Sequence, residues 1–356
     1  MIQAVFQPRD LRSDALGAFV PAVVLTGLGL ICVFSFGAEH FARQAAWALL
    51  GVGACLLVAR VPLEALRRCA LPALAAAAAL LAAALLFAPT VWGTKRWLVL
   101  PGGAAFFQPS ELAKLAIVLY LAHRLAAERD LKGRTLRVLW PVAGVCVLVL
   151  VAPDLGTTVY LAAVAGALLR IGGARLGKVC GVALGLVPLL LLVASRYPYM
   201  QERLQFFRGE LNYQQRQALL ALGSGGFMGN GLGAGRQKMD YLPAGHTDFA
   251  LANLGEELGF LGVCLVGLLF AMLLVHGVRV AFAAARAKER FGFFVACGAT
   301  FVVVFQALLN IAVATAAAPT KGISLPFLSQ GGSNLLVSLT AVGLILAVSR
   351  SLEART

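Results

Sequence analysis

From about residue 16 to about residue 350, long apolar runs alternate with shorter polar connections along the chain. About ten of these runs contain roughly 20 mostly apolar residues, the length that a helix needs to cross the hydrocarbon core of a bilayer. They are centred near Leu28, Val52, Ala79, Ile117, Val147, Ala165, Val187, Leu265, Val303 and Val342. The pattern predicts an all-α integral membrane protein with about ten transmembrane helices. An even number of spans places both termini on the same side.

Composition and the first apolar run both agree with a membrane protein. Of the 356 residues, 60% are hydrophobic and 13% are charged, whereas about 25% are charged in soluble domains. This composition excludes a soluble globular protein. The first run, from about Leu16 to Phe36, is longer than the apolar core of a signal peptide and lacks a convincing cleavage motif. We therefore expect it to stay as a spanning helix.

The distribution of positive charge orients the predicted spans. Lys and Arg number 30 against 16 Asp and Glu, which gives a formal net charge of +14. In a soluble protein such an excess points to nucleic acid, but here the basic residues gather in alternate connections, such as 124–137 and 279–290. Short cytoplasmic loops collect Lys and Arg in this way. Both termini are therefore predicted to be cytoplasmic, and we expect no nucleic-acid partner.

One connection, residues 195–247, is far longer than the few residues typical of helix connections. It separates the seventh and eighth predicted helices, and the charge distribution places it on the extracytoplasmic side. Its first half, from Tyr199 to Leu222, predicts one or two amphipathic helices at the membrane interface. Its second half, from Gly223 to Gly235, is glycine-rich and is predicted to be flexible. We expect residues 1–356 to form a single polytopic membrane domain that includes this loop.

Ionisable side chains at membrane depth are costly, so each one is a candidate for function. In the segment QPSELAK, Glu111 and Lys114 lie three residues apart on one face of a helix. They either form an internal ion pair that makes the helix tolerable in lipid, or present the lysine to an anionic head group. In the segment PDLGTT, Asp154 stands before the following span and is suited to cap it.

Two further polar segments lie on the predicted extracytoplasmic side. Asp248 stands where the long loop returns to the membrane, two residues after His246, which is placed to modulate it. An aspartate here either caps the next helix or acts in catalysis, and the residues alone favour neither. The loop from Lys321 to Asn334 contains one cation with several hydroxyl and amide groups. It is either an ordinary turn or a re-entrant loop whose backbone N–H groups cradle a phosphate.

Signatures of several other enzyme classes do not occur in the sequence. HExxH, Walker A, GxSxG and CxxC patterns are all missing, so metalloprotease, P-loop and α/β-hydrolase chemistry finds no support. The seven cysteines lie in or beside apolar runs and are interpreted as small core residues. No ligand cluster in the sequence requires a metal or another cofactor. A divalent cation, Mg²⁺ or Mn²⁺, is still compatible with chemistry at a phosphate.

Several motifs taken together point to one family. They are GTKRWLVL, QPSELAKLA, PDLGTT, GSGGFMGNGLG, QKMDYLPAGHTDF, GEELGFLG and PTKGISLPFLSQGGSNLL, in that order from Gly93 to Leu336. In these motifs, and in its layout of about ten spans with a large outer loop before the eighth, the chain closely resembles the SEDS family. This is the family of FtsW, RodA and SpoVE. Within it, GLGxGxQK and PTKGxxLPFxSxGGS resemble the division or sporulation type more than the elongation type.

The resemblance implies a peptidoglycan glycosyltransferase of the bacterial cytoplasmic membrane that polymerises lipid II on the extracytoplasmic side, for cell division or cell shape. The family's essential acidic residue falls on Asp248. This match implies a general base in an inverting reaction that releases undecaprenyl diphosphate. The substrate-binding residues that the resemblance implies, together with the nearby histidine, are Glu111, Lys114, Asp154, Arg96, Lys321 and His246.

The resemblance also implies a partner, because the family lacks its own cross-linking domain. That partner is a class B penicillin-binding protein, a transpeptidase, within the division or elongation machinery. Two other functions stay open: a flippase or transporter of lipid II, whose charges line a path, and a non-catalytic scaffold for the transpeptidase. Three positions depart from the usual family pattern, with Ala244 in place of Glu, Gln330 in place of Tyr and Asn334 in place of Ser.

Overall fold

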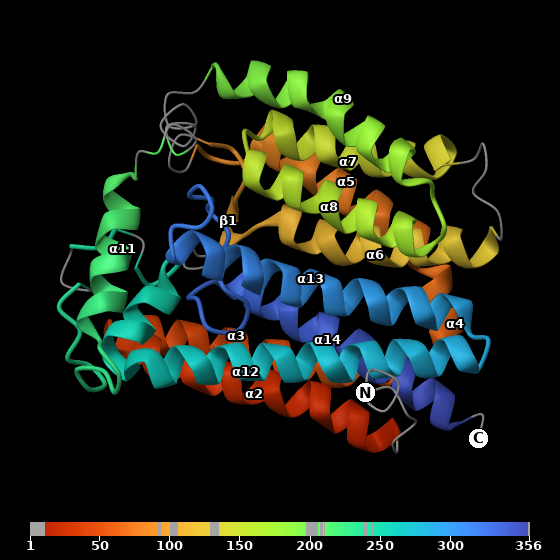
Figure 1. Ribbon diagram of the computed structural model, residues 1–356. Coiled ribbons are helices and arrows are strands. Elements are labelled where there is room, and N and C mark those ends of the chain that lie inside the picture. Colours follow the sequence, from red (N-terminus) through yellow and green to blue (C-terminus); the bar gives the residue numbers. More distant parts are fainter. Residues whose placement is uncertain are drawn as a thin grey trace.

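The computed structural model describes residues 11–90, 94–99, 106–128, 135–196, 206, 209, 211–237, 241–243 and 245–354. Ala244 and most of the segment 197–210 lie outside the described residues. A short antiparallel sheet pairs β1 (Leu98–Val99) with β2 (Phe106–Phe107), and the rest of the secondary structure described is helical (Figure 1). The helices are α2 (Leu11–Phe34), α3 (Ala38–Val58), α4 (Leu63–Arg68), α5 (Ala70–Phe87), α6 (Pro109–Ala127), α7 (Thr135–Val151), α8 (Leu155–Ile171), α9 (Leu176–Ala194), α11 (Tyr213–Ser224), α12 (Ala250–Arg286), α13 (Arg290–Ala314) and α14 (Gly332–Glu353).

The helices follow the predicted apolar runs. Six of them, α2, α3, α5, α12, α13 and α14, are long and apolar enough to cross a membrane, and α7 and α8 are shorter apolar helices. Each predicted span centre lies within a helix, including the interrupted runs near Ile117, Val147 and Ala165, which form α6, α7 and α8. The helical membrane fold is therefore confirmed. The count of ten spans and the rank of the helix before the long loop stay predictions.

The two ends of the helical bundle carry different segments. At one end, the start of α2 lies beside the end of α14: Ser349 Oγ donates a hydrogen bond to the Leu11 carbonyl oxygen (3.0 Å), and Arg12 Nε lies 3.5 Å from Glu353 Oε2. At the other end lie α11 and the start of α12 (Figure 1). We call these the terminal end and the α11 end. A chain with both termini on one side of a membrane and a long loop on the other requires this arrangement.

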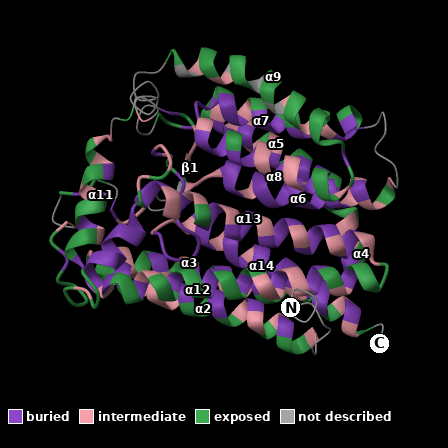
Figure 2. Ribbon diagram, in the orientation of Figure 1, coloured by how far each residue is buried: buried purple, intermediate pink, exposed green. Residues whose placement is uncertain are grey.

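Two groups of helices meet along α6 and α13. Helices α2, α3, α12, α13 and α14 pack together, and α5, α7 and α8 pack around α6. Burial is highest along α6, α13 and α14, whereas α9 at the edge is mostly exposed (Figure 2). Because lipid provides no hydrophobic drive between helices, close packing depends on small residues. A Cβ added to Gly343 of α14 would lie 2.6 Å from the Cys55 carbonyl oxygen of α3.

Helix α12 is broken at Gly259 (φ 68°, ψ −166°), and the glycine-rich segment packs into the break. The Gly231 N–H donates a hydrogen bond to the Glu257 carbonyl oxygen (3.0 Å), and the Phe260 N–H donates to the Gly226 carbonyl oxygen (2.9 Å). Gly226 and Gly231 both have left-handed backbone conformations, with φ of 52° and 100°. Contrary to the predicted flexibility, this segment is fixed by backbone hydrogen bonds, and its glycines provide the conformations that those bonds require.

A substitution at Gly229 tests this packing of the glycine-rich segment against α12. The φ of Gly229 is 81°, which is left-handed, and a Cβ there would overlap the Glu257 carbonyl oxygen. Gly229→Ala is expected to lower the midpoint of thermal unfolding in detergent, since the overlap adds to a left-handed cost of about 1–2 kcal/mol. Gly223→Ala is the matched control, because a Cβ at Gly223 meets nothing within 4 Å. Equal midpoints for the two variants would show that this packing does not contribute to stability.

Candidate active site at the α11 end

The first turns of α6 carry a buried ion pair. Pro109 occupies the start of the helix, where its missing N–H removes no helical hydrogen bond, and Glu111 and Lys114 follow on one face. Lys114 Nζ lies 2.7 Å from both Glu111 carboxylate oxygens and 2.7 Å from Gln306 Oε1 of α13. The predicted internal ion pair is confirmed. These acceptors match the three protons of the ammonium group, so an anionic ligand of Lys114 would have to replace one of them.

Two amide side chains of α13 hold the loop that follows α13. Gln306 Nε2 donates a hydrogen bond to the Ser324 carbonyl oxygen (2.7 Å), and Asn310 Nδ2 donates to the Ile323 carbonyl oxygen (2.9 Å). Asn310 Nδ2 also donates to the carbonyl oxygen of Asp248 (2.7 Å). Both amide side chains belong to buried residues. Neither was predicted from the sequence, although two amides four residues apart in an otherwise apolar span are a signal of a buried polar network.

Asp248 lies directly before α12 and outside its capping position. The N-cap of α12 is Phe249, and no side-chain capping hydrogen bond is formed there. The Asp248 residue is partly exposed, while its carbonyl oxygen is held by Asn310. Asp248 thus stands one residue before the N-cap position of α12, and both roles that the sequence left open stay predictions.

Asp154 caps α8, as the sequence predicts. Its Oδ1 accepts a hydrogen bond from the Thr157 N–H (3.0 Å), and its Oδ2 accepts one from the Thr157 hydroxyl (2.9 Å). Oδ2 also lies 3.6 Å from Arg96 Nη1 and accepts a hydrogen bond from Gln108 Nε2 at 3.4 Å. Asp154 therefore joins three segments: the start of α8, the segment before β1 and the start of α6.

The loop at Lys321 contacts both the first turn of α8 and Asp248. A Cβ added to Gly156, in the first turn of α8, would lie 3.5 Å from Lys321 Cβ. A Cβ added to Gly322 would lie 3.7 Å from Asp248 Oδ2. The short loop that carries Lys321 thus contacts both Asp248 and the first turn of α8, the helix that Asp154 caps.

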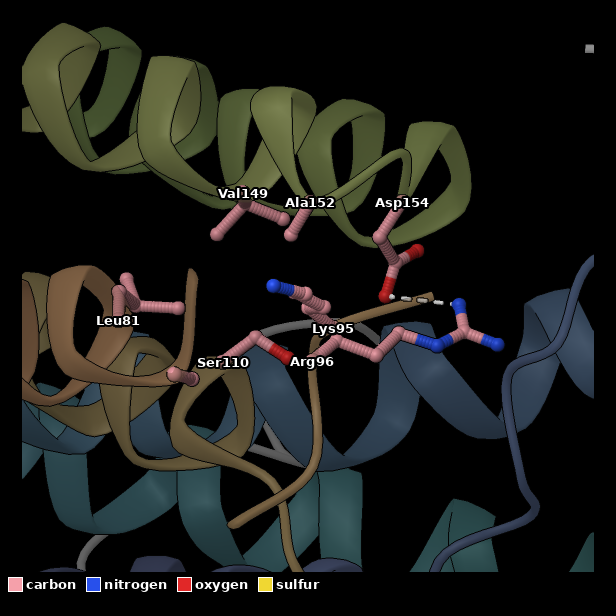
Figure 3. A pocket seen from close by; sticks show the side chains of 8 residues that line it. Leu81, Lys95, Arg96, Ser110, Val149, Ala152 and Asp154 are labelled. Carbon is pink, nitrogen blue, oxygen red and sulfur yellow. Dashed lines mark ion pairs between the residues drawn. The ribbon is translucent and has the colours of Figure 1, made fainter. Parts of the chain in front are cut away.

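A small pocket opens beside Asp154, and its lining side chains are shown in Figure 3. Arg96 and Asp154 both line it and form an ion pair (Nη1 to Oδ2, 3.6 Å), and Ser110 contributes a hydroxyl. Ser110 Oγ and Arg96 Nε are buried and have no hydrogen-bond partner among the described residues. Two cations, one carboxylate and a hydroxyl line it beside apolar walls, and its free volume of about 10 Å³ is the room of roughly one water molecule. The lining residues are Leu81, Ala84, Lys95, Arg96, Ser110, Val149, Ala152 and Asp154.

His246 packs against the start of α3. Its ring centroid lies 5.7 Å from that of Phe36 and 5.9 Å from that of His40. Its carbonyl oxygen accepts a hydrogen bond from the Gln330 N–H (2.9 Å), and the Gln330 side chain contacts His40 Nδ1. Burial lowers the pKa of His246, and the His40 ring lowers it further. The neutral imidazole is therefore favoured, and a modulating effect of His246 on Asp248 stays a prediction.

The lowered pKa of His246 links folding to pH. The unfolded chain binds a proton near the ordinary histidine pKa of about 6.5, whereas the folded chain binds it only at lower pH, so stability falls as the pH drops below about 6.5. His246→Gln is expected to reduce the loss of thermal midpoint between about pH 7.5 and about pH 5.5 relative to wild type. An identical loss in both proteins would show that His246 titrates alike in the folded and unfolded states.

The fold and the site together are those of a polytopic helical membrane protein. Its carboxylates, cations and amides meet at one end of the bundle. The chain belongs to the FtsW/RodA/SpoVE family, because the family model described as "Cell cycle protein" matches residues 16–354. A relative from Trichlorobacter lovleyi, named probable peptidoglycan glycosyltransferase FtsW, is 35% identical over 376 residues. The alignment covers 99% of this chain and 97% of the relative. The resemblance drawn from the motifs is confirmed.

Solved structures share the fold over nearly the whole chain. One chain, from a structure described as "Structural coordination of polymerization and crosslinking by a peptidoglycan synthase complex", matches with a TM-score of 0.77 and 27% identity. The match covers 94% of this chain and 97% of that chain. The rod shape determining protein RodA of Thermus thermophilus matches with a TM-score of 0.70 and 27% identity, covering 94% of this chain and 96% of RodA.

Proposed function

We propose that the protein is a peptidoglycan glycosyltransferase that polymerises lipid II at the outer face of the bacterial cytoplasmic membrane during cell division. The observation that carries the proposal is the contact of the Lys321 loop with both Asp248 and the first turn of α8. Glycosyl transfer from a lipid diphosphate needs a base for the acceptor and positive charge for the leaving group. The relatives named peptidoglycan glycosyltransferase FtsW support both the reaction and its place in division.

In the proposed reaction, Asp248 removes the proton from the 4-hydroxyl of an N-acetylglucosamine unit. The resulting oxygen attacks the anomeric carbon of the N-acetylmuramic acid of a second, lipid-linked chain. The bond from that carbon to the diphosphate oxygen breaks, the configuration inverts, and undecaprenyl diphosphate leaves with the bonding electrons. Contact with solvent at the partly exposed Asp248 residue gives the acquired proton a way out.

The cations around the Lys321 loop are proposed to bind the diphosphate. Arg96 and Lys321 both lie near the start of α8, at Asp154 and Gly156 respectively, and Arg96 contributes a planar donor group to the pocket. Glu111, Lys114 and Asp154 are proposed to complete the substrate-binding surface. The described residues contain no group of three or more His, Cys, Asp or Glu side chains that could hold a metal ion. Participation of Mg²⁺ or Mn²⁺ stays a prediction, which addition of a chelator to the polymerisation assay tests.

A class B penicillin-binding protein is the proposed partner. The structural relative described as a peptidoglycan synthase complex couples polymerisation to cross-linking. By analogy, this chain would supply the polymerase and its partner the transpeptidase.

Asp248→Asn is expected to reduce polymerisation by about 10²–10⁴-fold, because the amide keeps the shape of the carboxylate and loses its basicity. Glycan ladders from purified lipid II measure this loss, with the cognate penicillin-binding protein present and a β-lactam blocking cross-linking. Glu39→Gln is the control, since Glu39 is an exposed carboxylate in the first turn of α3.

Ladders of wild-type length from Asp248→Asn would remove the base assignment. If wild type itself makes no ladders while its partner is bound, the flippase and scaffold functions replace the polymerase. Transport of fluorescent lipid II across the membrane of proteoliposomes then distinguishes the flippase from the scaffold.

The Glu111–Lys114 pair needs a test that separates stability from substrate use. Lys114→Met leaves Glu111 buried without its cation, at an expected cost of about 3–5 kcal/mol. The double variant Glu111→Gln with Lys114→Met removes both charges, and its thermal midpoint is expected to recover. Its KM for lipid II is expected to stay raised, because substrate binding needs the charges themselves. If the double variant recovers both the thermal midpoint and the KM for lipid II, the ion pair has only a structural role.

A further inference from the structure

A second site lies at the terminal end, far along the bundle from Asp248. There a groove opens between the ends of α3 and α14, beside the start of α2. The groove is separate from the candidate active site, since the start of α2 and the end of α14 form the opposite end of the molecule (Figure 1). Its principal lining residues are Leu56, Ala59, Arg60, Leu346, Ser349 and Arg350.

The walls of this groove come from two segments with the same residue pattern. Residues 56–60 read LLVAR and residues 346–350 read LAVSR. In each, a leucine, a small residue three positions later and an arginine four positions later lie on one helical face. The two helices run in the same direction, because their starts are joined by Gln44 and Gly331 and their ends line the same groove. The groove is therefore bounded by two matching stripes, each ending in an arginine.

The two arginines are available to an anion. Arg60 and Arg350 are both exposed, and within the described part of the chain neither forms an ion pair. Glu353 also lines the groove, and its carboxylate lies 3.5 Å from the guanidinium of Arg12, which offsets its charge. The charge facing the groove is therefore positive, whereas Ala59 and Ser349 are small and leave room between the arginines.

The apolar half of the groove distinguishes a lipid from a soluble anion. Leu56 and Leu346 line it below the arginines, and the outer faces of α2 and α3 continue the apolar surface, with Leu16 59% and Leu57 67% exposed. A basic end with an apolar continuation matches a phosphate head group and its acyl chains. Inorganic phosphate has no apolar group that could contact the apolar half of the groove.

We propose that this groove binds an acidic phospholipid, with its phosphate between Arg60 and Arg350 and its acyl chains along the exposed faces of α2 and α3. The lipid belongs to the leaflet on the side of the two termini, which the charge distribution predicts to be cytoplasmic. A zwitterionic lipid is the weaker ligand, because its own cation cancels the phosphate charge. The inference is independent of the reaction at Asp248.

Native mass spectrometry of the full-length protein in detergent tests the site with phosphatidylglycerol and phosphatidylcholine as probes. An arginine near acidic lipid contributes about fivefold in affinity, so the pair is expected to favour phosphatidylglycerol by roughly 30-fold. Arg60→Gln with Arg350→Gln is expected to abolish this preference. Arg60→Lys with Arg350→Lys is expected to keep most of it, and thermal midpoints confirm that the variants are folded.

The matched control is Arg170→Gln with Arg175→Gln, which removes two exposed arginines outside the groove. This control is expected to keep the preference for phosphatidylglycerol. An equal loss in the control and groove variants would show diffuse attraction to a basic surface and overturn the site. Inorganic phosphate is not expected to displace the first bound phosphatidylglycerol. Its displacement would assign the groove to a soluble anion and overturn the lipid.

Discussion

The amides of Gln306 and Asn310 are the interaction on which the geometry of the α11 end depends. In a membrane, every backbone polar group must find its partner inside the protein. The loop after α13 has left the helical ladder, and these amides donate hydrogen bonds to its carbonyl oxygens at Ser324 and Ile323. Because Asn310 also holds the Asp248 carbonyl oxygen, one side chain fixes the loop relative to the start of α12.

The charges of the site are neutralised on two levels. The deeper level is Lys114, whose ammonium group is saturated by Glu111 and Gln306. The outer level is Asp154, which divides its oxygens between capping α8 and facing Arg96. Asp154 and Arg96 are thus held in place before any ligand arrives, whereas an anionic ligand of Lys114 has to displace Glu111 or Gln306.

Local patterns in the sequence were sufficient to predict part of this site. The ion pair within α6 and the capping of α8 both follow from residues three positions apart. The family motifs marked Asp248 and Lys321, but their approach to a common loop depends on helix packing. Contacts such as that between His40 and Gln330 join residues far apart in the chain, and periodicity carries no information about them. The amides of α13 had a detectable signal, yet their acceptors are backbone atoms of a distant loop.

Glycine content alone was a poor guide to the long loop. It indicates conformational freedom in an isolated chain, but left-handed residues are also what two backbones need when they approach closely. Gly226 and Gly231 serve that second purpose.

The break at Gly259 has a mechanical consequence for α12. The hydrogen bonds that a continuous helix would form across the break are exchanged with the glycine-rich segment, so the first turns of α12 belong to a unit that includes the loop. Glu256 extends this unit, since its carboxylate accepts the N–H groups of Arg236 and Gln237 (2.8 and 3.1 Å). The remainder of α12 is tied to the same unit, because the N–H groups of Phe260 and Leu261 donate to the carbonyl oxygens of Gly226 and Phe227 (2.9 and 3.2 Å). The glycine-rich segment therefore joins the two halves of α12 at the point where the helical ladder is interrupted, so the long loop and this helix are built as one piece.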